Sequence, residues 1–357
     1  MARFIQFAIA ASEFAMKQAD YRVDRVNSER TGIYIGSGIG GFEIVEREHV
    51  KLLEQGVSKV SPSLITASII NLASAQISIR FGISGPNLAC ATACTTGAHA
   101  IGEAFRLIQR GDADVMICGG TEAAITPLCV AGFCAMRALS TRNYSPEQAS
   151  RPWDAERDGF VIAEGAGILV LEEREHALKR GASVLAELVG YGRNADAHHH
   201  VTPRQDGTGA LRVMELALTD AGLEPKQIQY INAHATSTLL GDRAEANAIR
   251  KLFQRHASQL IISSTKSMTG HLLGGSGALE AGITVLALRD QIVPPTINHC
   301  CPDQDYQLNF SLERARHIQL HYAMTNSFGF GGSNACLVFR KHSPETNICE
   351  ESVKNAD

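Results

Sequence analysis

Length, charge and composition already narrow what this chain can do. It has 357 residues, of which 45% are hydrophobic, and 33 Lys and Arg against 37 Asp and Glu give a formal net charge of −4. This composition is typical of a globular protein with a sizeable core. No run approaches the ~18 apolar residues of a membrane span, and the basic excess of nucleic-acid-binding proteins is missing. We therefore expect no membrane and no nucleic acid as a partner.

The nine cysteines indicate a reducing compartment. Their number is odd, and they lack the short regular spacing of a disulfide scaffold. The N-terminal residues show no charged head followed by an apolar run and a small-residue cleavage site, which a secretory signal would need. We therefore predict a cytoplasmic protein in which most cysteines are buried.

Strand-like and helix-like segments alternate almost to the end of the chain, which is typical of an α/β fold. The first segment is a predicted helix over residues 2–16, where apolar side chains recur at helical spacing. Further helices are predicted over residues 95–110, 207–221, 242–253 and 277–289. Strands are predicted over residues 32–36, 115–119, 161–172, 184–191, 229–234, 260–265 and 335–340.

Two segments share one plan, which suggests a molecule built of two similar halves. Residues 91–110 and 265–289 each run from an apolar strand, through small and hydroxyl residues, into a helix rich in Ala and Gly. Helices of this composition are usually buried between other elements. We predict an N-terminal half over residues 1–180, a C-terminal half over 181–342 and a flexible polar tail over 343–357.

The glycine-rich segment 36–41 follows a predicted strand and matches the G-x-G-x-x-G pattern of dinucleotide-binding loops. That pattern also needs a second strand that ends in an acidic residue about 20 positions later, and residues 56–62 do not resemble such a strand. We therefore interpret the segment as a tight turn packed under another element.

Cys94 stands where an apolar strand turns into a helix of small residues. A thiol at a helix N-terminus experiences the positive end of the helix dipole, which favours the thiolate and makes the cysteine a nucleophile. From this segment alone, a buried structural cysteine remains the alternative.

Two histidines, His234 and His271, each follow a predicted strand among small, hydroxyl and glycine residues. Small neighbours leave room for a substrate, so both side chains are pocket candidates, with two ordinary loop histidines as the alternative. The glycine-rich loop 326–334 can direct backbone N–H groups at an oxyanion, or it is a simple turn before the last strand. We expect no metal at the histidine run 198–200, because three successive loop side chains diverge.

Taken in order, these segments resemble the β-ketoacyl-[acyl-carrier-protein] synthases, the condensing enzymes of fatty-acid elongation, and most closely those of type II. The resemblance covers residues 1 to about 340 and implies a thiolase-like five-layer αβαβα sandwich of two similar halves, usually assembled as a homodimer. The segments that carry it are Thr-Ala-Cys-Thr-Thr-Gly around Cys94, Asn-Ala-His-Ala-Thr-Ser-Thr around His234, Lys-Ser-Met-Thr-Gly-His ending at His271, Asn-Ser-Phe-Gly-Phe-Gly-Gly from Asn326, and the linking segments 132–143 and 151–160.

The resemblance also implies roles for individual residues. Cys94 would accept the acyl group, with His234 and His271 as catalytic histidines. Lys266 would support His271 and pair with the buried acid Glu280. The other implied positions are the backbone N–H groups of Cys94 and Phe330 as oxyanion hole; Thr236, Thr238, His199 and Thr202 at the phosphopantetheine arm; Ile39, Leu64, Phe133 and Phe330 in the acyl pocket; and Lys59 and Arg137 in contact with the carrier protein.

The implied reaction is a decarboxylative Claisen condensation. An acyl group held on Cys94 would combine with malonyl-[acyl-carrier-protein] to give 3-oxoacyl-[acyl-carrier-protein] and CO2. The resemblance implies no metal and no separate cofactor, because acyl carrier protein delivers both substrates on its phosphopantetheine arm. A synthase of polyketide or specialised metabolism shares all these motifs and stays an alternative.

The chain departs from the family mainly at its start. Family members begin several tens of residues earlier, with a strand that we expect to be central in its sheet, so that neighbouring strands would lack a ladder partner. A further alternative is therefore a truncated, inactive homologue that only binds carrier protein or a partner subunit.

Overall fold

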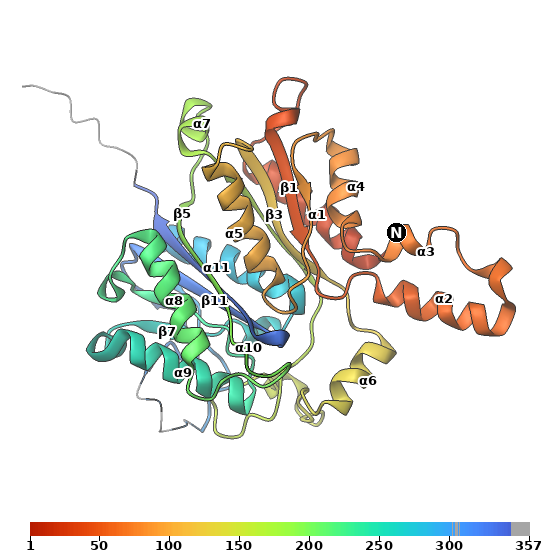
Figure 1. Cartoon of the computed structure of the whole chain (residues 1–357). Coiled ribbons are helices and arrows are strands. Elements are labelled where there is room, and N and C mark those ends of the chain that lie inside the picture. The colour runs from red at the N-terminus through yellow and green to blue at the C-terminus, as the bar shows by residue number, and fades with distance from the viewer. Residues whose placement is uncertain (302, 304–305, 307, 344–357) are drawn as a thin grey trace, which may run out of the picture.

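The structure is a computed structural model that describes residues 1–301, 303, 306 and 308–343. Apart from Ser343, the predicted tail lies outside the described residues. Two large sheets and the helices around them build the molecule (Figure 1). Within the described residues, no helix combines the length and the apolar character that crossing a membrane requires.

The first sheet has the strand order β2-β1-β3-β4. Its three strands β1 (Thr31–Gly36), β2 (Asn87–Leu88) and β3 (Val115–Glu122) are parallel, and β4 (Gly165–Glu172) runs antiparallel to β3. The helices of this half are α1 (Arg3–Gln18), α2 (Phe42–Gln55), α3 (Leu64–Ser68), α4 (Leu72–Phe81), α5 (Thr96–Gln109), α6 (Pro127–Ala135) and α7 (Arg174–Lys179), with the 3-10 helices η1 (Ser28–Arg30), η2 (Val57–Lys59) and η3 (Pro146–Gln148).

The second sheet has the order β5-β12-β11-β6-β7-β9. Its core strands are β6 (Tyr230–Asn232), β7 (Ile261–Ser263) and β11 (Tyr322–Gly329), all parallel, while β12 (Ser333–Lys341) runs antiparallel to β11 and to β5 (Ala186–Ala195). The other elements are α8 (Thr208–Ala221), α9 (Leu239–Phe253), α10 (Lys266–Thr269), α11 (Ser276–Asp290), β8 (Ile292–Val293), β9 (Asn309–Phe310), β10 (Arg316–His317), η4 (Pro225–Gln227), η5 (Gln254–Ser258), η6 (Leu273–Gly275) and η7 (Phe330–Gly332).

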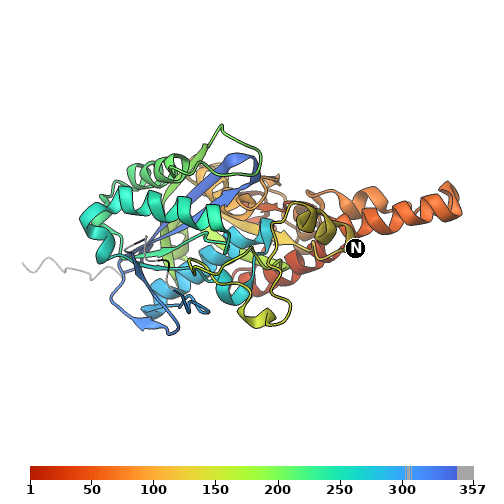
Figure 2. The same cartoon turned by 90° about the horizontal axis from the view of Figure 1, so that it is seen from below.

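Helices and sheets alternate in five layers. α1 and α4 cover the outer face of the first sheet, α5 and α11 lie between the two sheets, and α8 and α9 cover the outer face of the second (Figure 1). Three buried apolar clusters fill the spaces between the layers. The αβαβα arrangement predicted from the resemblance is therefore confirmed. In both views, α2 extends away from this layered body (Figures 1 and 2).

The two sheets match strand for strand, except at one edge. In this match β2, β1, β3 and β4 correspond to β7, β6, β11 and β12, since β4 and β12 are the antiparallel members. β5 pairs with the outer edge of β12, whereas within the described residues no strand pairs with the outer edge of β4. The strands of the first sheet are contiguous, so the expectation of a missing central strand is wrong; the unpaired position is at an edge.

The unpaired edge has a visible effect on burial. Leu169 and Leu171 of β4 are only partly buried, whereas Leu337 and Phe339 of β12 are almost completely inaccessible to solvent. α1 and α11 still pack on the two faces of β4, which keeps its apolar side chains largely covered.

The predicted strand 229–234 is shorter in the structure and ends at Asn232. The backbone N–H groups of His234 and Ala235 bind the buried carboxylate of Glu245 instead, at 3.0 and 2.8 Å. The chain thus leaves the ladder just before His234 and turns this side chain away from the sheet.

The two central helices approach each other at glycines. A Cβ atom on Gly97 of α5 would lie 2.7 Å from the backbone nitrogen of Ala278, and one on Gly277 of α11 would lie 2.8 Å from that of Ala98. Such contacts are too short for any side chain, so the glycines set the distance between the helices. α5 begins just after Cys94 in the sequence, and α11 begins at Ser276, whose hydroxyl contacts the ring of His271.

We therefore expect Gly97→Ala to lower the free energy of unfolding by about 1–3 kcal/mol, because the added methyl group forces the helices apart. Gly282→Ala is the matched control, because a Cβ there meets no atom within 4 Å. It should leave stability unchanged or raise it by about 0.5–1 kcal/mol, the usual gain of Ala over Gly in a helix. Urea unfolding of both variants measures the difference, and equal midpoints would contradict the close-approach argument.

Candidate active site

A cavity of about 500 Å³ lies where the two halves meet. The lining residues come from the carboxyl ends of strands and the starts of helices in both halves, which is where α/β proteins commonly bind ligands. Of the predicted site residues, the cavity is lined by Ile39, Cys94, Phe133, Arg137, His199, Thr202, His234, Thr236, Thr238, His271 and Phe330. Residues far apart in the sequence are thus brought to one place.

Cys94 lies just before α5, whose N-cap residue is Thr95. The preceding residue, Ala93, has a positive φ of 52°, a sparsely populated conformation for a residue other than glycine. Cys94 is 7% exposed, and burial raises the pKa of its thiol to about 12. The charge of Lys266 and the backbone N–H groups of Phe330 and Cys94 act in the opposite direction. The expected thiolate is therefore not the resting state; the thiol is protonated, because burial outweighs the helix terminus.

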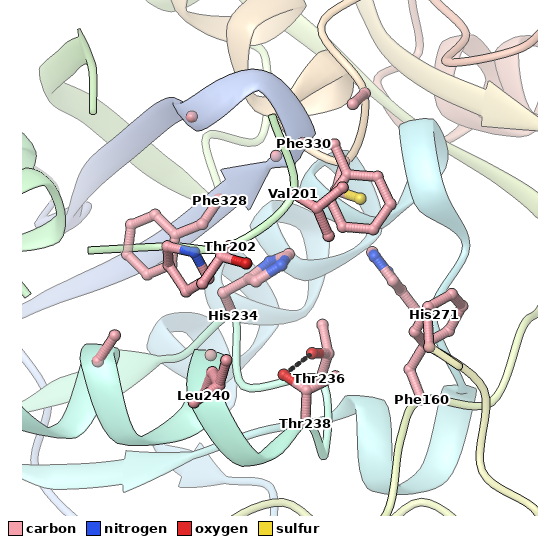
Figure 3. Close-up of a pocket in the computed structure, with 18 of the residues that line it drawn as sticks. Phe160, Val201, Thr202, His234, Thr236, Thr238, Leu240, His271, Phe328 and Phe330 are labelled. Atoms are coloured by element: carbon pink, nitrogen blue, oxygen red, sulfur yellow. Dashed lines mark hydrogen bonds between the residues drawn. The ribbon is translucent and has the colours of Figure 1, made fainter. Parts of the chain in front are cut away.

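His234 and His271 form an edge-to-face pair, with ring centroids 5.4 Å apart and an interplanar angle of 86°. Figure 3 shows both rings directed toward the space between them. Burial, followed by the charge of Lys266, places the pKa of each imidazole well below 6.5. Both rings are therefore neutral at neutral pH. Phe160 and Phe328 pack edge-on against His271 and His234, respectively.

The protein engages the Nδ1 atom of each histidine. The Nζ atom of Lys266 lies 3.4 Å from Nδ1 of His234, and Oγ of Ser276 lies 2.8 Å from Nδ1 of His271. An ammonium group can only donate, so Nδ1 of His234 is the acceptor, and the ring proton is on Nε2. This leaves the Nε2–H group of His234 as a hydrogen-bond donor for the cavity.

Lys266 is itself buried and forms an ion pair with Glu280, which is also buried. Burial raises the pKa of Glu280, and the Lys266 charge opposes this rise. Among the described residues, Oε2 of Glu280 has no hydrogen-bond partner, so the Lys266 charge is the main compensation for this carboxylate. The predicted pairing is thus present, but the lysine contacts His234 rather than His271.

The four residues predicted to bind the phosphopantetheine arm all line the cavity. The hydroxyl groups of Thr236 and Thr238 lie 3.2 Å apart and face the cavity (Figure 3). Nδ1 of His199 accepts hydrogen bonds from the backbone N–H groups of Val201 and Thr202, which fixes this loop. His199 and Thr202 line the same cavity as the two threonines.

Two predicted positions lie elsewhere. Leu64 is on α3 and packs against the apolar cluster of the first half, outside the residues that line the cavity, so it is not a wall position here. Lys59 is exposed at the end of η2, next to the projecting α2, and does not line the cavity either. The sequence alone does not distinguish Leu64 and Lys59 from the cavity residues Phe133 and Arg137. Whether a residue lines the cavity depends on how its segment packs against segments that are distant in the sequence.

Sequence reasoning missed three buried residues around the site. Glu245 holds the turn at His234, Ser276 holds the ring of His271, and Glu122 lines the cavity at the end of β3. Glu122 carried a usable signal, because an acidic residue at the end of a strand that is otherwise free of charge is costly to bury without a role. Within the described residues, no cluster of three His, Cys, Asp or Glu side chains has a geometry for a metal ion.

Comparison with known proteins agrees with this site. Residues 1–177 match the family model of the β-ketoacyl synthase N-terminal domain, and residues 185–299 match that of the C-terminal domain. The chain is 51% identical to 3-oxoacyl-[acyl-carrier-protein] synthase 2 of Vibrio cholerae over 340 residues, which is 95% of this chain and 82% of that protein. It is 50% identical to the Synechocystis protein of the same name over 342 residues, 96% of this chain and 82% of that protein.

Solved structures give the same result. A ketosynthase in complex with its type II polyketide acyl-carrier protein, bound to a hexaketide, superposes with a TM-score of 0.93 at 34% identity, over 96% of this chain and 85% of that chain. A β-ketoacyl synthase from Burkholderia phymatum superposes with a TM-score of 0.90 at 37% identity, over 96% and 83%. These matches confirm the resemblance, and the chain belongs to the β-ketoacyl synthase family.

Proposed function

We propose that the chain is a condensing acyltransferase of fatty-acid biosynthesis, which joins an acyl group to malonyl-[acyl-carrier-protein] and releases 3-oxoacyl-[acyl-carrier-protein] and CO2. The observation that carries this proposal is one cavity that holds the thiol of Cys94 beside two neutral imidazoles. The relatives at about 50% identity bear the name of this activity.

In the first step, the sulfur of Cys94 attacks the thioester of the acyl-carrier protein. Because the thiol is protonated at rest, the neutral imidazole of His271 takes its proton and passes it to the departing pantetheine sulfur, since Nε2 of His234 already carries a proton. The backbone N–H groups of Cys94 and Phe330 lie at the cysteine sulfur and stabilise the tetrahedral oxyanion. The products are an acyl-enzyme thioester and free carrier thiol.

In the second step, malonyl-carrier protein loses CO2, and the electron pair of the broken C–C bond moves onto the thioester oxygen. The Nε2–H group of His234 donates a hydrogen bond to this enolate oxygen. The enolate carbon then attacks the acyl carbonyl on Cys94. The new C–C bond replaces the C–S bond, and the sulfur of Cys94 leaves as a thiolate that takes up a proton from water.

The same site implies the partners. The hydroxyls of Thr236 and Thr238 suit the amides of a phosphopantetheine arm, and Arg137 and Lys59 are the proposed contacts for an acidic carrier protein. No step requires a metal or separate cofactor. Exposed apolar side chains on and after α2, such as Leu53 and Val57, support a homodimer. The cysteines in the described residues are free, which suits the proposed cytoplasmic location.

We expect Cys94→Ala to abolish condensation, because no acyl-enzyme can form. The rate of 3-oxoacyl product formation from acyl- and malonyl-carrier protein should fall by at least about a thousandfold. Cys300→Ala is the control, since Cys300 is exposed and outside the cavity. Unchanged activity in Cys94→Ala would remove the assigned nucleophile, and an unreduced poly-β-keto product from the unaltered chain would favour a polyketide synthase.

The acylation rate should be insensitive to pH around the usual histidine pKa. The imidazole of His271 must be neutral to take the thiol proton, and its pKa lies well below 6.5. Lowering the pH from 7.5 to about 6 should therefore leave the rate of Cys94 acylation nearly constant, with a decline only at lower pH. This pH profile is measured by quenching acylation reactions at set times and determining the acyl-enzyme fraction by intact-protein mass spectrometry. An inflection at about pH 6.5 would show that the histidines titrate normally.

We expect the loss of either Lys266 or Glu280 alone to destabilise the protein strongly, because each charge compensates the other. Lys266→Met or Glu280→Gln each leaves one uncompensated buried charge and should cost about 3–5 kcal/mol of stability, while the double variant should cost less than the sum. Glu13→Gln breaks the exposed pair with Arg80 and should cost at most about 1 kcal/mol. Urea unfolding compares the four variants, and single substitutions as mild as Glu13→Gln would contradict the argument.

A further inference from the structure

Glu122 is a buried carboxylate that the mechanism above does not use. It is the last residue of β3, it has no exposed surface, and it lines the cavity. Burial raises its pKa, while four hydrogen-bond donors act in the opposite direction. A buried acid costs free energy unless it is well satisfied, so its partners are informative.

Four donors occupy the two oxygens of Glu122. Oε1 accepts from the hydroxyl of Ser37 at 2.6 Å and from the backbone N–H of Ile39 at 3.2 Å. Oε2 accepts from the backbone N–H groups of Gly38 and Gly274 at 2.8 and 3.0 Å. Only an ionised carboxylate accepts at all four positions, because a protonated acid or an amide would present a donor to one of them.

The fit around Oε2 leaves no room for side chains. A Cβ atom on Gly38 would lie 2.6 Å from Oε2, and one on Gly274 would lie 2.7 Å from it. The hydroxyl of Ser37 also accepts the backbone N–H of Gly40 at 3.0 Å, so the whole turn after β1 is organised around this carboxylate. The glycine-rich segment 36–41 is thus the predicted tight turn, and Glu122 is what it packs on.

These donors belong to two functional segments from different halves. Ile39 packs with Cys94 in the small apolar cluster beside the cavity, so the turn at 37–40 carries a residue of the proposed acyl pocket, which we call the pocket floor. Gly274 lies in η6, three residues after His271 and two before Ser276, which contacts the His271 ring. One carboxylate therefore connects the floor of the pocket to the segment that carries a histidine.

We propose that Glu122 is a positioning residue that locks the acyl-pocket floor to the His271 segment and thereby limits the length of acyl chain that Cys94 accepts. This inference rests on the proposed function. On this proposal, a chain long enough to reach Ile39 displaces it, and the hydrogen bond from the Ile39 backbone N–H to Glu122 resists that displacement. A chain that ends above Ile39 does not meet this resistance.

Glu122→Gln tests the proposal, because it keeps the shape but places an NH2 group against N–H donors. The ratio of acylation rates with tetradecanoyl- and hexanoyl-carrier protein should rise roughly fivefold, the effect of losing about one hydrogen bond. Intact mass spectrometry of the acyl-enzyme gives both rates. Ser37→Ala removes one donor and leaves the carboxylate, so it should raise this ratio less than Glu122→Gln does. If Glu122→Gln does not fold, the ratio in Ser37→Ala tests the proposal.

Glu48→Gln is the matched control. Glu48 is also buried in the first half and accepts a backbone N–H, that of Ser61 at 2.8 Å, but it does not line the cavity. Its substitution should leave the chain-length ratio unchanged even if stability falls. An unchanged ratio in both Glu122→Gln and Ser37→Ala, or an equal rise in Glu48→Gln, would overturn the proposal.

Amide hydrogen exchange provides a readout that does not depend on activity. In Glu122→Gln, residues 37–40 and 273–275 should exchange faster together, whereas in Glu48→Gln both segments should keep the exchange rates of the unaltered chain. Unchanged exchange in Glu122→Gln would show that the carboxylate does not hold these segments. If the unaltered chain forms no acyl-enzyme while the exchange result holds, the proposed function fails and the positioning role of Glu122 stands.

Discussion

The close approach of α5 and α11 between the two sheets is the constraint on which the rest of the structure depends. Both helices are rich in small residues, and the glycines at their crossing leave only backbone between them. α5 starts just after Cys94, and α11 starts at Ser276, the partner of His271. Packing two sheets onto this pair of helices therefore brings residues from the two halves into one cavity.

A single buried cation organises the electrostatics of that cavity. Lys266 lies against Nδ1 of His234 and pairs with Glu280, and its charge lowers the pKa of both histidines and of Cys94. For the histidines, burial and the cation act in the same direction and keep the rings neutral. For the cysteine they oppose each other, and burial dominates. The result is a protonated thiol beside neutral imidazoles, which makes proton transfer part of the acylation step.

The sequence alone predicts the fold class and most of the residues that line the site, because short local residue patterns indicate both. Cys94, His234 and His271 each follow a strand among small residues, and the order of the segments identifies the family. The protonation state of Cys94 and the position of Leu64 outside the cavity lining could not be predicted from the sequence, because both depend on three-dimensional burial. The position of the unpaired edge at β4 was also missed, since strand order within a sheet is not visible in the order of the chain. Glu122 and Glu245 were missed because their donors come from distant segments.

Burial and the Lys266 ammonium together keep His234 neutral, and the ammonium at Nδ1 places the ring proton on Nε2. Histidine nitrogen-15 NMR of the unaltered chain at neutral pH tests this most directly, because the chemical shifts of the two ring nitrogens distinguish both tautomers and the cation. We expect a neutral ring protonated on Nε2, and a mixture of tautomers once Lys266 is replaced by Met. An imidazolium, or a ring protonated on Nδ1, in the unaltered chain would contradict this expectation.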